Sequence, residues 1–158
     1  MSRNWEGQVR AHADDAFAIV VSRYNATITE RLLDGALRVL RGAGVPDPRI
    51  DVVRVPGAWE IPVAARVLAR SGRYAAVLCL GAVIRGETSH DQYINEQVSR
   101  GLGEIALETD LPVLFGVLTC HSLEQAIQRA GGNAGNKGEE CADAALRMAD
   151  LLRALRGA

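Results

Sequence analysis

The chain is predicted to fold as one α/β domain with a doubly wound, four-stranded parallel sheet and helices on both faces. Short apolar runs alternate with amphipathic helical stretches along its 158 residues, which is the pattern of parallel strands joined by helices. The first, third and fourth of these runs are almost continuously apolar, as strands buried on both faces are. The length corresponds to about one domain, and neither a repeat nor a linker interrupts it.

Four runs are the predicted strands: residues 16–22, 50–55, 75–80 and 112–119. A Pro-Gly pair at 56–57 ends the second of them. We expect the strand order 2-1-3-4, with the loop 81–88 following the third strand. This order puts the topological switch point between the first and third strands, and open α/β sheets bind ligands there, beyond the carboxyl ends of the strands.

The predicted helices begin at Thr27, Trp59, Ser89, Ser122 and Asn136. In four of the five, all but the helix at Trp59, a Glu or Gln three residues after the first residue completes the pattern of a capping box. The last helix is expected to run to about residue 155. Residues 1–15 are polar and show no period, so they are interpreted as a loose arm or an edge strand.

Charge and composition exclude several classes of protein. The 18 basic and 19 acidic residues give a net charge of −1, which argues against a nucleic-acid binder. Apolar stretches reach about six residues, far short of the ~20 that span a membrane, and no secretory signal is expected at the start. Three cysteines without a C-x-x-C pair indicate a reducing cytoplasm, and the His and Cys spacing predicts no metal site.

Aromatic and titratable side chains gather where the predicted strands end. His90 lies in the first turn of a helix, and a neutral imidazole there can accept a proton and return it. A solvent-facing histidine without a role is the alternative. Tyr24 and Trp59 follow the first two strands, where they can stack on a planar ring or cover the sheet edge as packing.

A second set of candidates lies towards the carboxyl terminus. Arg129 and Lys137, the one lysine of the chain, flank a glycine-rich loop at 131–135 that leads into a helix. Exposed helix amides with a nearby cation hold phosphate well, although a plain helix–helix turn has the same spacing. Phe115 falls inside the fourth strand, so a place in the core is its default interpretation.

Three segments resemble the lumazine synthase family in the same order: VPGAWEIP (55–62), GAVIRGETSH (81–90) and QAIQRAGGNAGNKGEECA (125–142). The resemblance covers nearly the whole chain, from about Phe17 to the last helix. It implies a flavodoxin-like three-layer sandwich over a single domain, 1–158. It also implies an enzyme of riboflavin biosynthesis that condenses 5-amino-6-(D-ribitylamino)uracil with 3,4-dihydroxy-2-butanone 4-phosphate, releasing phosphate and water without a metal or cofactor.

The resemblance implies a role for one set of residues on the pyrimidine substrate: Tyr24, Ala58, Trp59, Glu60, Ala82, Val83 and Ile84. Tyr24 matches the aromatic that stacks on the pyrimidine, although the family usually has Phe or Trp there. Residues 58–60 match the segment that holds the ribityl chain and ring. Residues 82–84 match backbone contacts to the uracil.

A second set is implied to serve the phosphate and the chemistry: Glu87, Thr88, His90, Phe115, Arg129, Lys137 and Glu140. Glu87 and Thr88 match a phosphate-facing turn, and His90 matches the catalytic proton carrier. Phe115 matches a ring-contacting aromatic, Arg129 the arginine that binds the phosphate, Lys137 a lysine near the substrates, and Glu140 an acidic position near the histidine. The imine-forming amine belongs to the pyrimidine substrate, so the resemblance argues against a Schiff base on Lys137.

The resemblance further implies a homopentamer or a multiple of it, up to an icosahedral capsid, with each site between neighbouring subunits. Phe115 and Arg129 would then complete the site of a neighbour. Riboflavin synthase is a further candidate partner, whereas nucleic acid and membranes are not expected. The alternative function is a non-catalytic flavin- or lumazine-binding module of the same fold, which would not need His90 together with Arg129.

Overall fold

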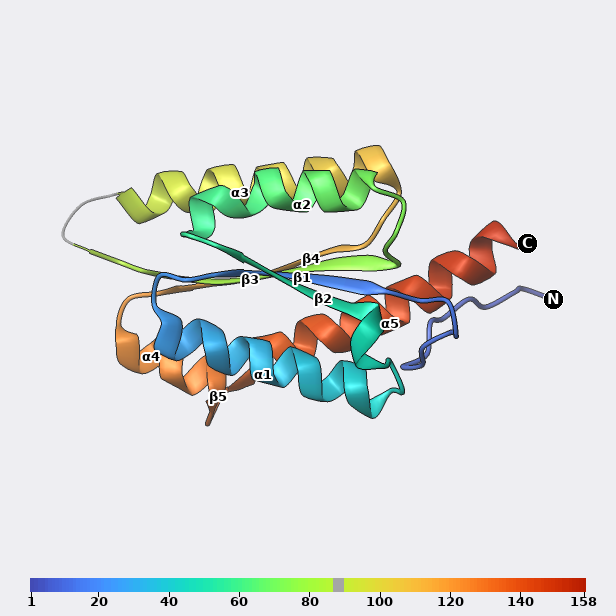
Figure 1. Ribbon diagram of the computed structural model, residues 1–158, viewed down its shortest axis with the longest axis horizontal. Helices are drawn as coiled ribbons and strands as arrows, with labels where there is room; N and C mark the ends of the chain where they lie inside the picture. The colour runs from blue at the N-terminus through green and yellow to red at the C-terminus, as the bar shows by residue number, and fades with distance from the viewer. Residues whose placement is uncertain (87–89) are drawn as a thin grey trace.

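A four-stranded parallel sheet lies between two layers of helices in the computed structural model, which describes residues 1–86 and 90–158 (Figure 1). The strands are β1 (Phe17–Ser22), β2 (Ile50–Val55), β3 (Ala76–Ile84) and β4 (Val113–Cys120). Their order is β2-β1-β3-β4, and every neighbouring pair is parallel. The predicted fold class and strand order are therefore confirmed.

Two helices cover one face of the sheet, and three cover the other (Figure 1). On one face lie α2 (Ile61–Arg70) and α3 (His90–Thr109); on the other lie α1 (Ala26–Gly42), α4 (Leu123–Arg129) and α5 (Lys137–Arg156). Shorter elements connect them: the 3₁₀ turns η1 (Asp47–Arg49) and η2 (Ala58–Glu60), and a small hairpin of β5 (Ala130–Gly132) and β6 (Gly135–Asn136). None of the described helices is long and apolar enough to cross a membrane.

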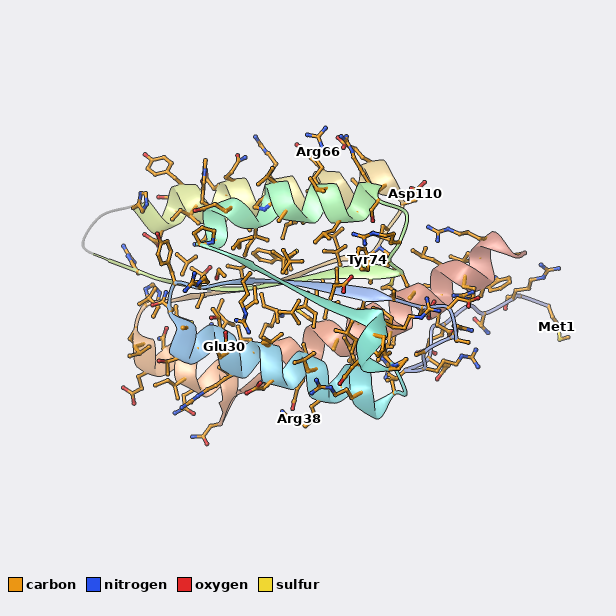
Figure 2. All side chains as sticks on the ribbon, in the orientation of Figure 1. Met1, Glu30, Arg38, Arg66, Tyr74 and Asp110 are labelled. Atoms are coloured by element: carbon orange, nitrogen blue, oxygen red, sulfur yellow. The ribbon has the colours of Figure 1, made fainter. Side chains whose placement is uncertain are left out.

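The side chains of β1 alternate between two cores, one on each face of the sheet. Phe17, Ile19 and Val21 pack with α1, α4 and α5, whereas Ala18 and Val20 pack with α2 and α3. All five are fully buried, and the side chains fill both spaces between the layers (Figure 2). Each buried large aliphatic side chain stabilises the fold by about 1.5–3 kcal/mol. This double burial explains why the strand is apolar throughout.

Several predicted boundaries are shifted, and two of the shifts bear on the site. The helix predicted from Trp59 opens as the 3₁₀ turn η2, and α2 itself begins at Ile61. The third strand does not end at residue 80 but continues through Ile84, because β4 pairs with it as far as Ile84 and Cys120. Residues 82–84 are therefore strand and not loop. The first helix begins at Ala26 and not Thr27, and its N-cap is Asn25, whose side chain makes no bond to the helix.

Two predicted helix caps are confirmed by hydrogen bonds. The Ser122 hydroxyl accepts from the Gln125 amide at 3.2 Å, and Oδ1 of Asn136 accepts from the Glu139 amide at 3.1 Å. The predicted cap at Ser89 lies outside the described residues.

The first fifteen residues form no strand, and α5 anchors the part from residue 7 to residue 15. A β-carbon on Gly7 would lie 1.8 Å from the carbonyl oxygen of Arg147, so the arm touches the helix backbone there. The buried carboxylate of Asp150 accepts from the Gln8 amide, Nε of Arg10 and Nε2 of His12, all within 2.8–2.9 Å. The bonds from Gln8, then Arg10 and His12, hold the pKa of Asp150 below its usual range against the opposing effect of burial.

Replacing Asp150 by asparagine is expected to lower the free energy of unfolding by about 2 kcal/mol at pH 7, because charge-assisted hydrogen bonds are lost. The native state keeps Asp150 ionised to a lower pH than the unfolded chain does. Its stabilisation is therefore fully present above the unfolded pKa of about 4 and is lost progressively as the pH falls from there through the lower pKa of the folded state. Urea unfolding at pH 7 and pH 3 measures both effects.

Asp143→Asn is the matched control for this prediction. Asp143 lies on the same helix and pairs with Arg147 on the surface, where both side chains are about half exposed. Such a pair contributes only about 0.3–0.5 kcal/mol. Equal losses in the two variants, or a loss from Asp150→Asn that does not shrink at low pH, would contradict the anchoring role.

Candidate active site

The carboxyl ends of all four strands meet at one edge of the sheet, on the left in Figure 1. The order of the strands across the sheet, β2-β1-β3-β4, makes β1 and β3 neighbours at the centre and places the switch point between them. Beyond β1 the chain turns towards β2, since the amide of Tyr24 donates to the carbonyl oxygen of Pro56 at 3.0 Å. A crevice at this point is where an open α/β sheet binds its ligand.

Tyr24 offers an exposed ring beside the turn that follows β2. The side chain is 67% exposed, and a β-carbon on Gly57 would lie 2.6 Å from Cδ2 of the ring. Glycine at position 57 is therefore required for Tyr24 to lie in this place. The ring packs against the backbone of Gly57 and stays largely exposed, which suits stacking on a planar ligand.

Trp59 and His90 are exposed on the layer that contains α2 and α3. Trp59 is 55% exposed within η2 and lines a cavity of about 630 Å³ together with Tyr93 and Gln97 of α3. His90 is the first residue of α3 and is exposed. In η2, Ala58 is buried and Glu60 is half-buried, so this short turn presents Trp59 while its neighbour packs inward.

The end of β3 supplies backbone and not side chains to this edge. Ala82 and Val83 are buried and Ile84 is half-buried, and all three lie within the strand. The side chain of Asn25 donates to the carbonyl oxygen of Ala82 at 3.0 Å. The backbone of this segment is thus held by strand pairing on one side and by an amide side chain on the other.

Phe115, Arg129 and Lys137 line one cavity of about 420 Å³ beside β4, together with Val117, Leu118, Thr119, Ala134 and Glu140. Arg129 ends α4 and Lys137 begins α5, so two cations from different elements meet there. Phe115 is 42% exposed, which contradicts a place in the core. Its strand lies at the sheet edge, so its side chain lacks the cover that central strands have.

Buried thiols lie beside the two cations of this cavity. Nη1 of Arg129 lies 3.9 Å from the buried Sγ of Cys120. One turn beyond Lys137, burial raises the pKa of Cys141 to about 11, although Lys137 opposes the shift. Cys141 is therefore a neutral thiol near pH 7 and not a nucleophile. All three cysteines are buried and unpaired.

The predicted site residues thus fall into two groups within the described structure. Of the described residues that line the cavity beside β4, none is Tyr24, Trp59 or His90. Glu140, which the resemblance places near the histidine, lines the cavity beside β4 with Arg129 and Lys137. Glu87 and Thr88 lie outside the described residues. Sequence reasoning missed Asn25, whose only local signal is an asparagine between a strand and a helix.

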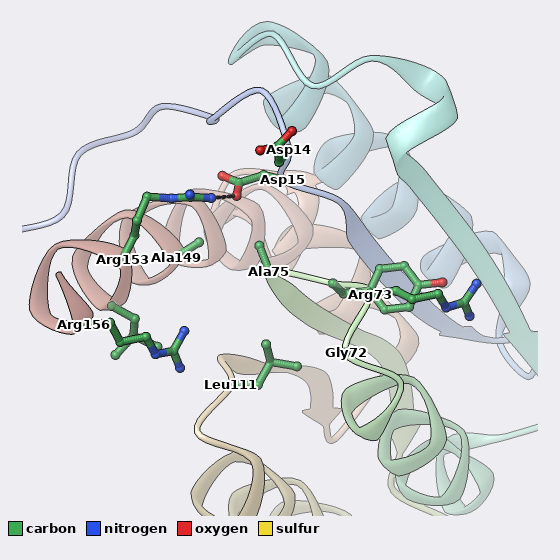
Figure 3. A pocket seen from close by; sticks show the side chains of 11 residues that line it. Asp14, Asp15, Gly72, Arg73, Ala75, Leu111, Ala149, Arg153 and Arg156 are labelled. Atoms are coloured by element: carbon green, nitrogen blue, oxygen red, sulfur yellow. Dashed lines mark hydrogen bonds and ion pairs between the residues drawn. The ribbon is translucent and has the colours of Figure 1, made fainter.

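Another cavity, of about 350 Å³, lies at the opposite edge of the sheet (Figure 3). Its charges serve the fold: Arg153 pairs with the buried Asp15, and Arg156 donates to the carbonyl oxygen of Asp110 beyond the end of α3. Cations near helix carboxyl ends offset the partial negative charge there. Across residues 1–86 and 90–158, no three His, Cys, Asp or Glu side chains cluster so as to hold a metal ion.

Comparison with known proteins agrees with this geometry. The model of the family described as 6,7-dimethyl-8-ribityllumazine synthase matches residues 15–153. A protein of Desulfotalea psychrophila (strain LSv54 / DSM 12343), named 6,7-dimethyl-8-ribityllumazine synthase, is 54% identical over 151 residues. That match covers 96% of this chain and 97% of the relative. The chain therefore belongs to the 6,7-dimethyl-8-ribityllumazine synthase family, a family of transferases of riboflavin biosynthesis.

Proposed function

We propose that the two residue groups at the carboxyl edge hold the two substrates of lumazine formation. The observation that carries the proposal is the cavity in which Arg129, Lys137 and Phe115 meet. Two cations beside one aromatic ring suit a small phosphorylated ketone, since guanidinium and ammonium groups bind phosphate oxygens. This cavity therefore takes 3,4-dihydroxy-2-butanone 4-phosphate.

The other group takes 5-amino-6-(D-ribitylamino)uracil. Tyr24 stacks on the pyrimidine ring, and its exposed, backbone-supported ring favours that role. Polar edges of the pyrimidine bond to the backbone of residues 82–84, while the segment 58–60 holds the ribityl chain. Neither substrate needs a cofactor for this condensation.

The reaction moves protons at each step, and His90 carries them. The amine of the pyrimidine attacks the ketone, and loss of water leaves an imine. Phosphate is then eliminated, and ring closure with loss of a second water gives the lumazine. An imidazole that accepts and returns protons serves several of these steps. Glu87 and Thr88 contribute to phosphate binding in this proposal.

We further propose a ring of five subunits, or a multiple of it, in which each site lies between neighbours. Apolar side chains left exposed over the α2 and α3 layer support such an interface: Trp59, Val63, Val67 and Tyr93. Phe115, exposed on edge strand β4, supports a second contact. Residues 1–158 act as one domain in this assembly, and riboflavin synthase is its candidate partner. Three unpaired cysteines support a cytoplasmic location.

The two substrate positions are tested by a pair of variants. Arg129→Ala is expected to raise the KM of the phosphorylated ketone by roughly 10- to 100-fold, because the phosphate loses a charge-assisted hydrogen bond. Tyr24→Ala is expected to raise the KM of the pyrimidine by about tenfold, through lost stacking. Steady-state lumazine formation, followed by absorbance with each substrate varied in turn, measures both.

Arg70→Ala controls for the loss of an exposed arginine, because Arg70 pairs with Glu108 far from this edge. Both of its KM values are expected to stay within about twofold of the parent values. If Arg129→Ala has the same KM for the ketone as the parent protein, the proposed phosphate position is wrong. A protein that binds lumazine or riboflavin yet forms no product from the two substrates would instead be a non-catalytic binding module.

A further inference from the structure

The backbone beyond β1 leaves a gap in the sheet at the switch point. Pairing of β1 with β3 ends at Val21 and Leu80. The next amides turn away from β3: that of Arg23 donates to the carbonyl oxygen of Val55 at 2.8 Å, and that of Tyr24 donates to Pro56. The part of β3 beyond Leu80 therefore has no strand beside it on the β1 side.

Asn25 bridges this gap with its side chain. Nδ2 of Asn25 donates to the carbonyl oxygen of Ala82 at 3.0 Å, two residues beyond the last position at which β3 pairs with β1. Ala82 is only 5% exposed. Without the Asn25 amide its carbonyl oxygen would lack this partner, at a cost of about 1–3 kcal/mol. The amide thus extends the hydrogen-bond ladder by one step where the strand is absent.

Asn25 makes this bond from an unfavourable backbone conformation. Its φ of 62° and ψ of 45° are left-handed, a region that costs most L residues about 1–2 kcal/mol and that asparagine tolerates better. The helix start does not require the side chain, since α1 receives no side-chain cap and the Asn25 carbonyl oxygen accepts from the Ile28 and Thr29 amides. Strain of this kind persists where the surroundings impose it, and it often occurs at functional sites.

We infer that Asn25 is a positioning residue that holds the end of β3 at a fixed place relative to the Tyr24 ring. Tyr24 is the residue before Asn25, and Ala82 begins the backbone segment assigned to the uracil. One hydrogen bond therefore joins the stacking surface and the hydrogen-bonding edge of the pyrimidine position. This inference rests on the proposed function, in which both elements contact the same substrate.

The test uses two variants that keep the left-handed backbone and lose the donor. Asn25→Gly adopts positive φ without strain, and Asn25→Asp keeps the size of the side chain but cannot donate when ionised. Each is expected to raise the KM of the pyrimidine by roughly 5- to 10-fold, with the KM of the phosphorylated ketone within about twofold. Calorimetric titration with the pyrimidine alone is expected to show the same loss of affinity without turnover.

The unequal change in the two KM values separates positioning from a structural role. If Asn25 only stabilises the fold, both variants lower the thermal unfolding midpoint and leave the pyrimidine affinity unchanged, which overturns the inference. Equal changes in both KM values overturn it too. Tyr24→Ala separates a failure of this inference from a failure of the proposed function. If Tyr24→Ala alone weakens pyrimidine binding, the inference fails and the proposed function stands. If neither Tyr24→Ala nor Asn25→Gly weakens it, the proposed pyrimidine position is wrong.

Discussion

Replacing His90 by alanine is expected to lower kcat by about 10²- to 10³-fold, which is within the range that a positioned general acid–base group contributes. His90 begins α3 at the carboxyl edge and is exposed, so its replacement removes a proton carrier without opening the core. Residual turnover is expected because holding two reactants together supplies effective molarities of about 10⁵–10⁸ M. Steady-state rates at saturating concentrations of both substrates measure the change.

His121→Ala is the control for this experiment. His121 is also exposed at the carboxyl edge, directly after β4. Its backbone amide donates a hydrogen bond to Oε1 of Gln125. Its replacement is expected to change kcat by less than about twofold. A normal kcat in His90→Ala, or a loss of ketone phosphate binding in a normally folded variant, would contradict the division between proton transfer at His90 and phosphate capture at Arg129.

The strand positions could be predicted from the sequence because apolar periodicity is a local property, and the order 2-1-3-4 is typical of the doubly wound fold that this alternation predicts. The end of β3 could not be predicted, because its last residues form a strand only by pairing with β4. This pairing extends to Ile84 and Cys120. The conformation of residues 82–84 is therefore a long-range property. Their place beside the switch point followed from the expected strand order, whereas their strand geometry required the structure.

The candidate site divides in the same way. Tyr24 and Trp59 follow strand ends, a position that left stacking and packing open, and the structure shows both side chains exposed. Phe115 lies inside a strand, and its default interpretation as core failed because β4 is an edge strand whose outer side chains lack cover. Asn25 was missed because its partner Ala82 is 57 positions away along the chain. Spacing rules detect helix caps three residues apart, as at Ser122, but not bonds of that separation.

The division of the site residues into two groups has a consequence for the assembly. In a closed ring with head-to-tail contacts, one side of each subunit meets the opposite side of its neighbour. The group with Tyr24 and His90 would then face the group with Phe115 and Arg129 of the adjacent subunit. Each complete site would draw its proton carrier and its phosphate-binding arginine from different chains.

Mixing His90→Ala subunits with Arg129→Ala subunits is therefore expected to restore activity, measured at a ketone concentration below the parent KM, where Arg129→Ala alone keeps only about 1–10% of the parent rate. In randomly mixed rings at equal amounts, about one site in four combines an intact His90 with an intact Arg129, so activity returns to roughly a quarter of the parent value. Subunits are unfolded and refolded together, exchange is verified by mass spectrometry of intact rings, and each variant refolded alone is the control.

The fraction recovered distinguishes the possible locations of the site. If each subunit holds a complete site, every chain in the mixture lacks one of the two groups, and proven mixed rings stay as inactive as the separate variants. Recovery in proportion to the product of the two subunit fractions, tested at several mixing ratios, requires sites built from two chains. A stable monomer with full activity would exclude both the shared site and the ring, because the exposed Phe115 and Arg129 would then complete a site within their own chain.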